Sequence, residues 1–64
     1  MTVPDMQWEE FADFSIIQGS LKAVYVELRD SCAPEPIWLA RKVAKVEGDR
    51  FLVRRWVAVE RGLI

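Results

Sequence analysis

The stretch Val46–Phe51, which reads VEGDRF, contains the clearest structural signal in this chain of 64 residues. Gly48 can adopt the positive φ that a tight turn requires and that other residues avoid. The residues that follow, 51–59 (FLVRRWVAV), are dense in types that favour β-strands. Two strands joined by a short loop that contains glycine form a hairpin. The segment therefore predicts a β-hairpin that turns at Gly48.

The segment before this turn, residues 37–47, fits two structures. As a strand, it leaves neither face purely apolar, because basic residues fall on both faces. As a helix, it places Leu39, Ala40, Val43 and Val46 on one stripe, and Pro36 suits a first helical position. The turn at Gly48 favours the strand, and a helix–turn–strand unit of winged-helix-like type is the alternative.

A strand is predicted at residues 21–29, where Val24, Val26 and Leu28 form the apolar face. Residues 30–36 follow it as a loop that contains two prolines. At the other end of the chain, Val57–Ile64 predicts a last short strand with a bend at Gly62.

A short helix is predicted at residues 5–15, which precede these strands. Trp8, Phe11, Ala12 and Ser15 recur at the spacing of one helical face. Pro4 suits the first helical position, and acidic residues favour the positive N-terminal end of a helix.

The length and composition indicate one folded domain that spans residues 1–64. Hydrophobic residues make up 52% of the chain, and three Trp, three Phe and one Tyr supply large apolar surfaces. The net charge of −1 argues against a globally basic nucleic-acid binder, although basic residues gather in residues 41–61. Charges interrupt every apolar run before the roughly 18 residues that a membrane span needs.

Catalytic and metal-binding residues are poorly supplied. The chain has no histidine, which is the commonest general base, and a single cysteine, Cys32. No spacing of metal ligands is present, and the glycines are too isolated to cradle a phosphate. The sequence therefore predicts a protein that is not an enzyme and that needs no metal or cofactor.

Two sets of residues could bind a ligand. The first is aromatic, and rings gathered at one end of a barrel can enclose a methylated ammonium by cation–π contact. The second is basic and could hold nucleic-acid phosphates. The alternatives are that the rings fill the core and that the basic side chains form a solvated sheet face. The aromatic candidates are Tyr25, Trp38, Phe51 and Trp56, and the basic candidates are Arg41, Lys42, Lys45, Arg54 and Arg55.

The run from Trp38 to Trp56, WLARKVAKVEGDRFLVRRW, resembles the central hairpin of the Tudor, agenet and MBT group of chromatin-associated SH3-like barrels. The preceding LKAVYVEL at 21–28 is similar to the first strand of those barrels, and WEEF at 8–11 is similar to the lead-in helix of MBT repeats. The matching positions are Trp38, Val43, Val46, Gly48 and Val53.

The resemblance implies a mainly β fold, with a small SH3-like barrel over residues 21–64 after the helix at 5–15. It implies a non-catalytic, nuclear, chromatin-type module that recognises a methylated Lys or Arg, or a protein partner. Trp38 and Trp56 would form the walls of an aromatic cage, with Tyr25 or Phe51 as a third wall. Two other functions stay open. One is a small DNA-binding protein of winged-helix or excisionase-like type that uses residues 41–55, and the other is an oligomerisation or scaffold domain.

Overall fold

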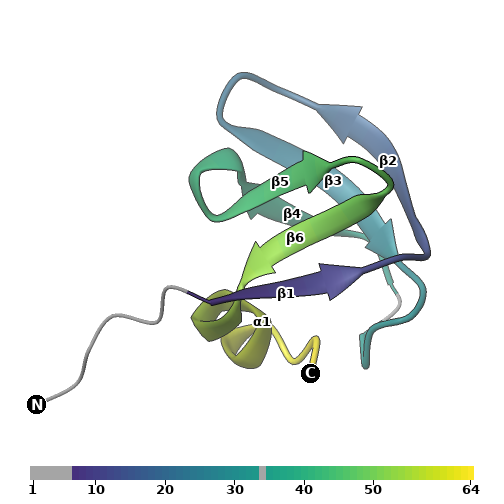
Figure 1. Cartoon of the computed structure of the whole chain (residues 1–64). Helices are drawn as coiled ribbons and strands as arrows, with labels where there is room; N and C mark the ends of the chain where they lie inside the picture. The colour runs from purple at the N-terminus through teal and green to yellow at the C-terminus, as the bar shows by residue number, and fades with distance from the viewer. Residues whose placement is uncertain (1–6, 34) are drawn as a thin grey trace, which may run out of the picture.

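The computed structural model describes residues 7–33 and 35–64, and within them the chain is mainly β (Figure 1). Six strands form two three-stranded antiparallel sheets, and one short α-helix follows the last strand. The elements are β1 (Trp8–Phe11), β2 (Phe14–Gly19), β3 (Ala23–Leu28), β4 (Ile37–Ala40), the 3₁₀ turn η1 (Arg41–Val43), β5 (Ala44–Glu47), β6 (Arg50–Arg54) and α1 (Arg55–Glu60).

The chain passes between the two sheets at two corners. One sheet has the order β1-β6-β5 and the other the order β2-β3-β4. The first corner lies at Ala12 and Asp13, between β1 and β2, and the second is η1, between β4 and β5. Strands that change sheets at such bends bring two sheets face to face around one core. No strand pairing in the described residues joins the two sheets, so they do not form a closed barrel.

The predicted hairpin at Val46–Phe51 is confirmed. Val46 pairs with Phe51 and Glu47 with Arg50, and Gly48 takes a φ of 63° in the turn between them. The strand predicted at 21–29 is also confirmed over Ala23–Leu28, and its apolar face is the buried one.

Residues 37–47 form two strands interrupted by η1, so the helical alternative is wrong, and with it the winged-helix-like arrangement of this segment. Leu39 in β4 and Ala44 in β5 are both buried. An unbroken strand would place these two residues on opposite faces, because they are separated by an odd number of positions. The 3₁₀ turn shifts the alternation of inward and outward side chains between β4 and β5. This shift explains why residues 37–47, taken as one strand, have no purely apolar face.

The helix predicted at residues 5–15 is wrong from Trp8 onward; Asp5 and Met6 lie outside the described residues. The chain is extended there because β1 pairs with β6 from Trp8 opposite Arg54 to Phe11 opposite Phe51. Those backbone hydrogen bonds satisfy an edge of β6 that would otherwise be unpaired, and this tertiary pairing overrides a helical spacing of side chains.

The strand predicted at Val57–Ile64 is also wrong, because the chain turns into α1 at Arg55. The helix buries Val57 and Ala58 against the sheets, which a strand leaving β6 could not do. The predicted bend at Gly62 is present, since Gly62 has a φ of 74° and ends the helix. Beyond it, Leu63 folds back and donates its N–H to the carbonyl of Ala58 at 2.7 Å.

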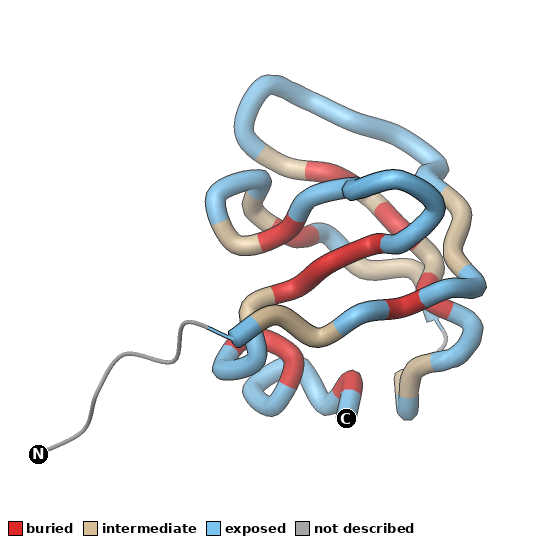
Figure 2. Tube along the Cα trace, in the orientation of Figure 1, coloured by how far each residue is buried: buried red, intermediate tan, exposed pale blue. Residues whose placement is uncertain are grey.

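The core lies between the sheets and is closed at one end by α1. Figure 2 shows its buried segments on facing strands and on the helix. Phe51 is 1% exposed and its ring lies 5.5 Å from that of Phe14. The core residues are Phe11, Val24, Val26, Leu28, Leu39, Ala44, Phe51, Val53, Val57, Ala58 and Leu63.

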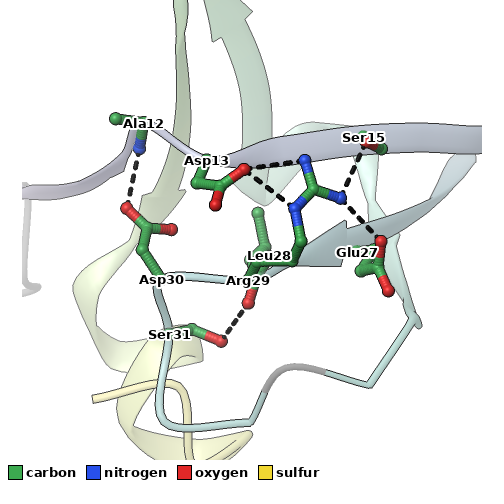
Figure 3. Close-up of polar contacts among 8 residues, drawn as sticks. All are labelled: Ala12, Asp13, Ser15, Glu27, Leu28, Arg29, Asp30 and Ser31. Carbon is green, nitrogen blue, oxygen red and sulfur yellow. Dashed lines mark hydrogen bonds and ion pairs between the residues drawn. The ribbon is translucent and has the colours of Figure 1, made fainter.

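A polar network braces the corner between β1 and β2 (Figure 3). Arg29 donates to the Asp13 carboxylate at 2.8 Å, and also to Ser15 and Glu27. The bonds to Asp13, and then to Glu27, raise the pKa of the Arg29 guanidinium above its ordinary value, so this group stays charged. Beside it, the Ala12 N–H donates to the Asp30 carboxylate at 2.9 Å. The loop after β3 therefore fixes the point where the chain changes sheets.

Replacing Asp30 with alanine is expected to lower the free energy of unfolding by about 1 kcal/mol, because the Ala12 N–H loses its charged acceptor. Urea unfolding followed by circular dichroism measures the change. Asp30→Asn keeps an acceptor oxygen and should cost less. The control is Asp49→Ala, since the Asp49 side chain is 90% exposed in the β5–β6 turn and its loss should cost under about 0.5 kcal/mol. Equal effects of the two alanine variants would show that the Asp30 contact contributes nothing to stability.

Candidate binding surface

Tyr25 and Trp38 form an aromatic pair on the outer face of the β2-β3-β4 sheet. They are register partners in the β3–β4 ladder, and their ring centroids lie 5.1 Å apart at an interplanar angle of 28°. Their neighbours Val24 and Leu39 point into the core, so the alternation of side chains along a strand turns the two rings outward. Trp38 remains 43% exposed. The pair is therefore a stacked aromatic surface that faces solvent.

On the side toward Ala23, the positions that flank this pair on the same face are uncharged. Gln18 of β2 lies opposite Tyr25, and Ala23 lies opposite Ala40 at the next outward position. The nearest charge along β3 is Glu27, which already forms an ion pair with Arg29 at 2.7 Å. The two rings therefore have small or neutral neighbours on the side of Ala23 and the paired charges of Glu27 and Arg29 on the other side.

The four aromatic residues predicted to form a cage are only partly brought together. Tyr25 and Trp38 meet, but Phe51 is buried in the core and cannot serve as a cage wall. Trp56 lies on α1, and no ring contact within the described residues joins it to the pair. The two rings that meet are stacked and leave no gap for an ammonium group, and the described surface contains no pocket.

The five basic candidates lie at several places. Arg41 donates to the Ser20 carbonyl at 2.6 Å, beside the exposed Lys42 of η1. Arg55, at the start of α1, donates to the Gln7 side chain at 2.8 Å. Lys45 and Arg54 are the two that meet, on the outer face of the β1-β6-β5 sheet. The predicted basic segment is thus not one continuous surface.

Lys45 and Arg54 both contact the ring of Trp8. Trp8 was not among the residues predicted to form a site, because the sequence indicated a helix at residues 5–15. The Lys45 Nζ lies 4.7 Å and the Arg54 Cζ lies 4.1 Å from the centroid of the Trp8 ring, both within cation–π range. The residues of β1 contain no alternation of polar and apolar side chains that could have indicated a strand, since each face of WEEF carries one aromatic residue and one glutamate.

Acidic side chains share this second face and are paired with the basic ones. Lys45 lies 3.5 Å from Glu47, and Arg50 lies 3.9 Å from Glu10. A face of alternating, paired charges is typical of a solvated sheet surface and presents less attraction to a polyanion than a uniformly basic one. The described residues support the Tyr25–Trp38 surface better than this one as a binding site.

Other kinds of site find little support in residues 7–33 and 35–64. No group of three potential metal ligands comes together there. Cys32 is exposed and forms no disulfide. No helix in that part of the chain is long and apolar enough to cross a membrane.

Comparison of the chain with family models, with curated proteins and with solved structures found no match.

Proposed function

We propose that this protein is a non-catalytic binding module that recognises an extended peptide segment of a protein partner through the Tyr25–Trp38 surface. The observation that carries the proposal is the stacked ring pair, partly exposed on the outer face of the β2-β3-β4 sheet. Tryptophan and tyrosine are the side chains most often found to dominate binding energy at protein interfaces. They supply a large contact area at a low cost in side-chain entropy.

The stacking prepares the site for binding. Tyr25 packs against one side of the Trp38 ring and limits its rotation, so a partner does not have to order that ring. The small flanking residues Ala23 and Ala40 leave room beside the rings for the side chains of a bound peptide.

We also propose that the two sheets are a partly open form of an SH3-like barrel. The support is the pair of corners, Ala12–Asp13 and η1, through which both sheets share a single core. The predicted chromatin role requires that the bound peptide contain a methylated lysine or arginine. A methylated lysine would have to contact the face of the Trp38 ring that points away from Tyr25, because Tyr25 covers the other face of that ring.

Replacing Trp38 with alanine is expected to weaken peptide binding by 10-fold or more, as the loss of a central aromatic contact of about 2 kcal/mol implies. Peptides that bind the wild-type domain would be selected from a phage-displayed library, and their affinities for each variant measured by calorimetry. The matched control is Trp56→Ala, because Trp56 is exposed to a similar extent, 50%, on a different surface. Its affinity should stay within about twofold of the wild type.

Two further probes separate the rival functions. One is a pair of peptides that differ only in trimethylation of one lysine, and the other is duplex DNA. Preference for the trimethylated peptide, lost in Trp38→Ala, would support the chromatin role. DNA binding that falls steeply with salt and is lost in Lys45→Ala with Arg54→Ala would support the nucleic-acid alternative. If the selected peptides bind Trp38→Ala as tightly as the wild type, the proposed surface is wrong.

A further inference from the structure

The outer edge of β2 differs from the edges of the other sheet. β2 is hydrogen-bonded to β3 on one side and has no strand neighbour on the other within the described residues. Ile16 and Ile17 on this strand are half-exposed, and Leu21 at the tip of the β2–β3 hairpin is 97% exposed. In Figure 2 the outer part of β2 together with the tip of this hairpin, residues 16–22, is the longest continuous exposed segment of the described residues.

Residues 14–21, FSIIQGSL, contain no charge and no proline. Edge strands usually carry charged residues, which prevent pairing with other chains. The edges of the β1-β6-β5 sheet do so, with Glu9 and Glu10 on β1 and Lys45 and Glu47 on β5. β4, the other edge of the β2-β3-β4 sheet, is only four residues long and lies between Pro36 and Arg41. β2 is therefore the long edge whose own residues lack this protection, and charged groups reach it only near its ends, where Arg29 contacts Ser15 and Arg41 contacts Ser20.

We propose that two copies of this chain associate by pairing their β2 strands antiparallel across a two-fold axis. A two-fold interface requires a surface that complements itself. A strand whose own residues are uncharged meets this requirement, because pairing it with its own copy opposes no like charges of the strand itself and buries isoleucine against isoleucine. The backbone groups on the open side of both strands would gain hydrogen-bond partners, as in other strand-addition interfaces.

The pairing would join two sheets into one of six strands, in the order β4-β3-β2-β2-β3-β4. The irregularity between Ile16 and Gln18 in the β2–β3 ladder twists the strand at that point, so the new ladder is short. The assembly is therefore a reversible one that depends on concentration. The joined sheet would present two Tyr25–Trp38 surfaces on one face, so that a partner with two binding segments would gain from both. This last consequence rests on the proposed function, whereas the pairing itself does not.

Multi-angle light scattering over a range of concentrations tests the pairing, with Ile17→Lys as the disrupting variant. Ile17 is 53% exposed, so lysine should be tolerated by the fold but would place like charges opposite each other in the pair. The wild type is expected to rise toward twice the mass of the single chain as concentration increases, and Ile17→Lys should keep the single mass throughout. The matched control, Val59→Lys, introduces the same charge at a 59% exposed position on α1 and should behave as the wild type.

Hydrogen exchange of the wild type provides a second measurement that does not depend on any variant folding. Protection of the β2 amides should increase with concentration while that of the β5 amides stays constant. A wild-type mass that remains that of one chain at all concentrations would overturn the proposal. A mass that falls in Val59→Lys but not in Ile17→Lys would also overturn it and would place the interface on α1.

Discussion

Replacing Phe51 with alanine is expected to lower the free energy of unfolding by about 3–5 kcal/mol, which is close to the whole stability of a domain of this size. Phe51 is 1% exposed and contacts Phe14 across the two sheets. It also occupies the central strand of its sheet, where it pairs with Phe11 on one side and with Val46 on the other. The backbone around it can move little to fill the space, because all three strands are held by backbone hydrogen bonds.

Urea unfolding followed by tryptophan fluorescence and circular dichroism measures this effect. The control is Leu21→Ala, because Leu21 is almost fully exposed and its truncation should change stability by less than about 0.5 kcal/mol. A loss below about 1 kcal/mol in Phe51→Ala would contradict the position of Phe51 in the core, and would reopen its predicted role as a cage wall.

Replacing Leu63 with alanine is expected to cost about 2–5 kcal/mol, although the residue lies after the last helix. Leu63 is 1% exposed and belongs to the core. Its N–H donates to Ala58 and its carbonyl accepts from Cys32 at 2.8 Å, so its backbone is held on both sides. The side chain closes the end of the core that α1 covers.

The neighbouring Ile64 provides a matched control, since it has a similar size and is half-exposed. Ile64→Ala should cost less than about 1 kcal/mol in the same unfolding experiment. If the two variants lose equal stability, the tail after Gly62 does not pack as described.

The hairpin at Val46–Phe51 and the strand β3 could be predicted because their signals are local. Gly48 needs only its own backbone freedom, and Val24, Val26 and Leu28 alternate within one strand. β1 could not be predicted in this way. Its residues show a helical spacing, and they become a strand because β6, far along the chain, offers them an unpaired edge.

The candidate site could be predicted only in part, because some of its residues are positioned by local alternation and others by the path of the chain. Tyr25 and Trp38 were both proposed, and cross-strand register brings them together. Trp56 was proposed as a strand residue, but the helix after Arg54 moves it to another surface. Phe51 could have been excluded from the sequence, because the outward positions of its strand are marked by Arg50 and Arg54 and the alternation turns Phe51 inward.

The ladder between β1 and β6 also determines the order in which the domain can assemble. The β5–β6 hairpin joins residues separated only by a turn, and such hairpins form within microseconds. β1 must then find β6 across most of the chain, and closing a loop of that length costs entropy before any contact is gained. We therefore expect this long-range docking to limit the folding rate, in the millisecond-to-second range typical of small β proteins. Until β1 arrives, β6 presents an open edge of its own.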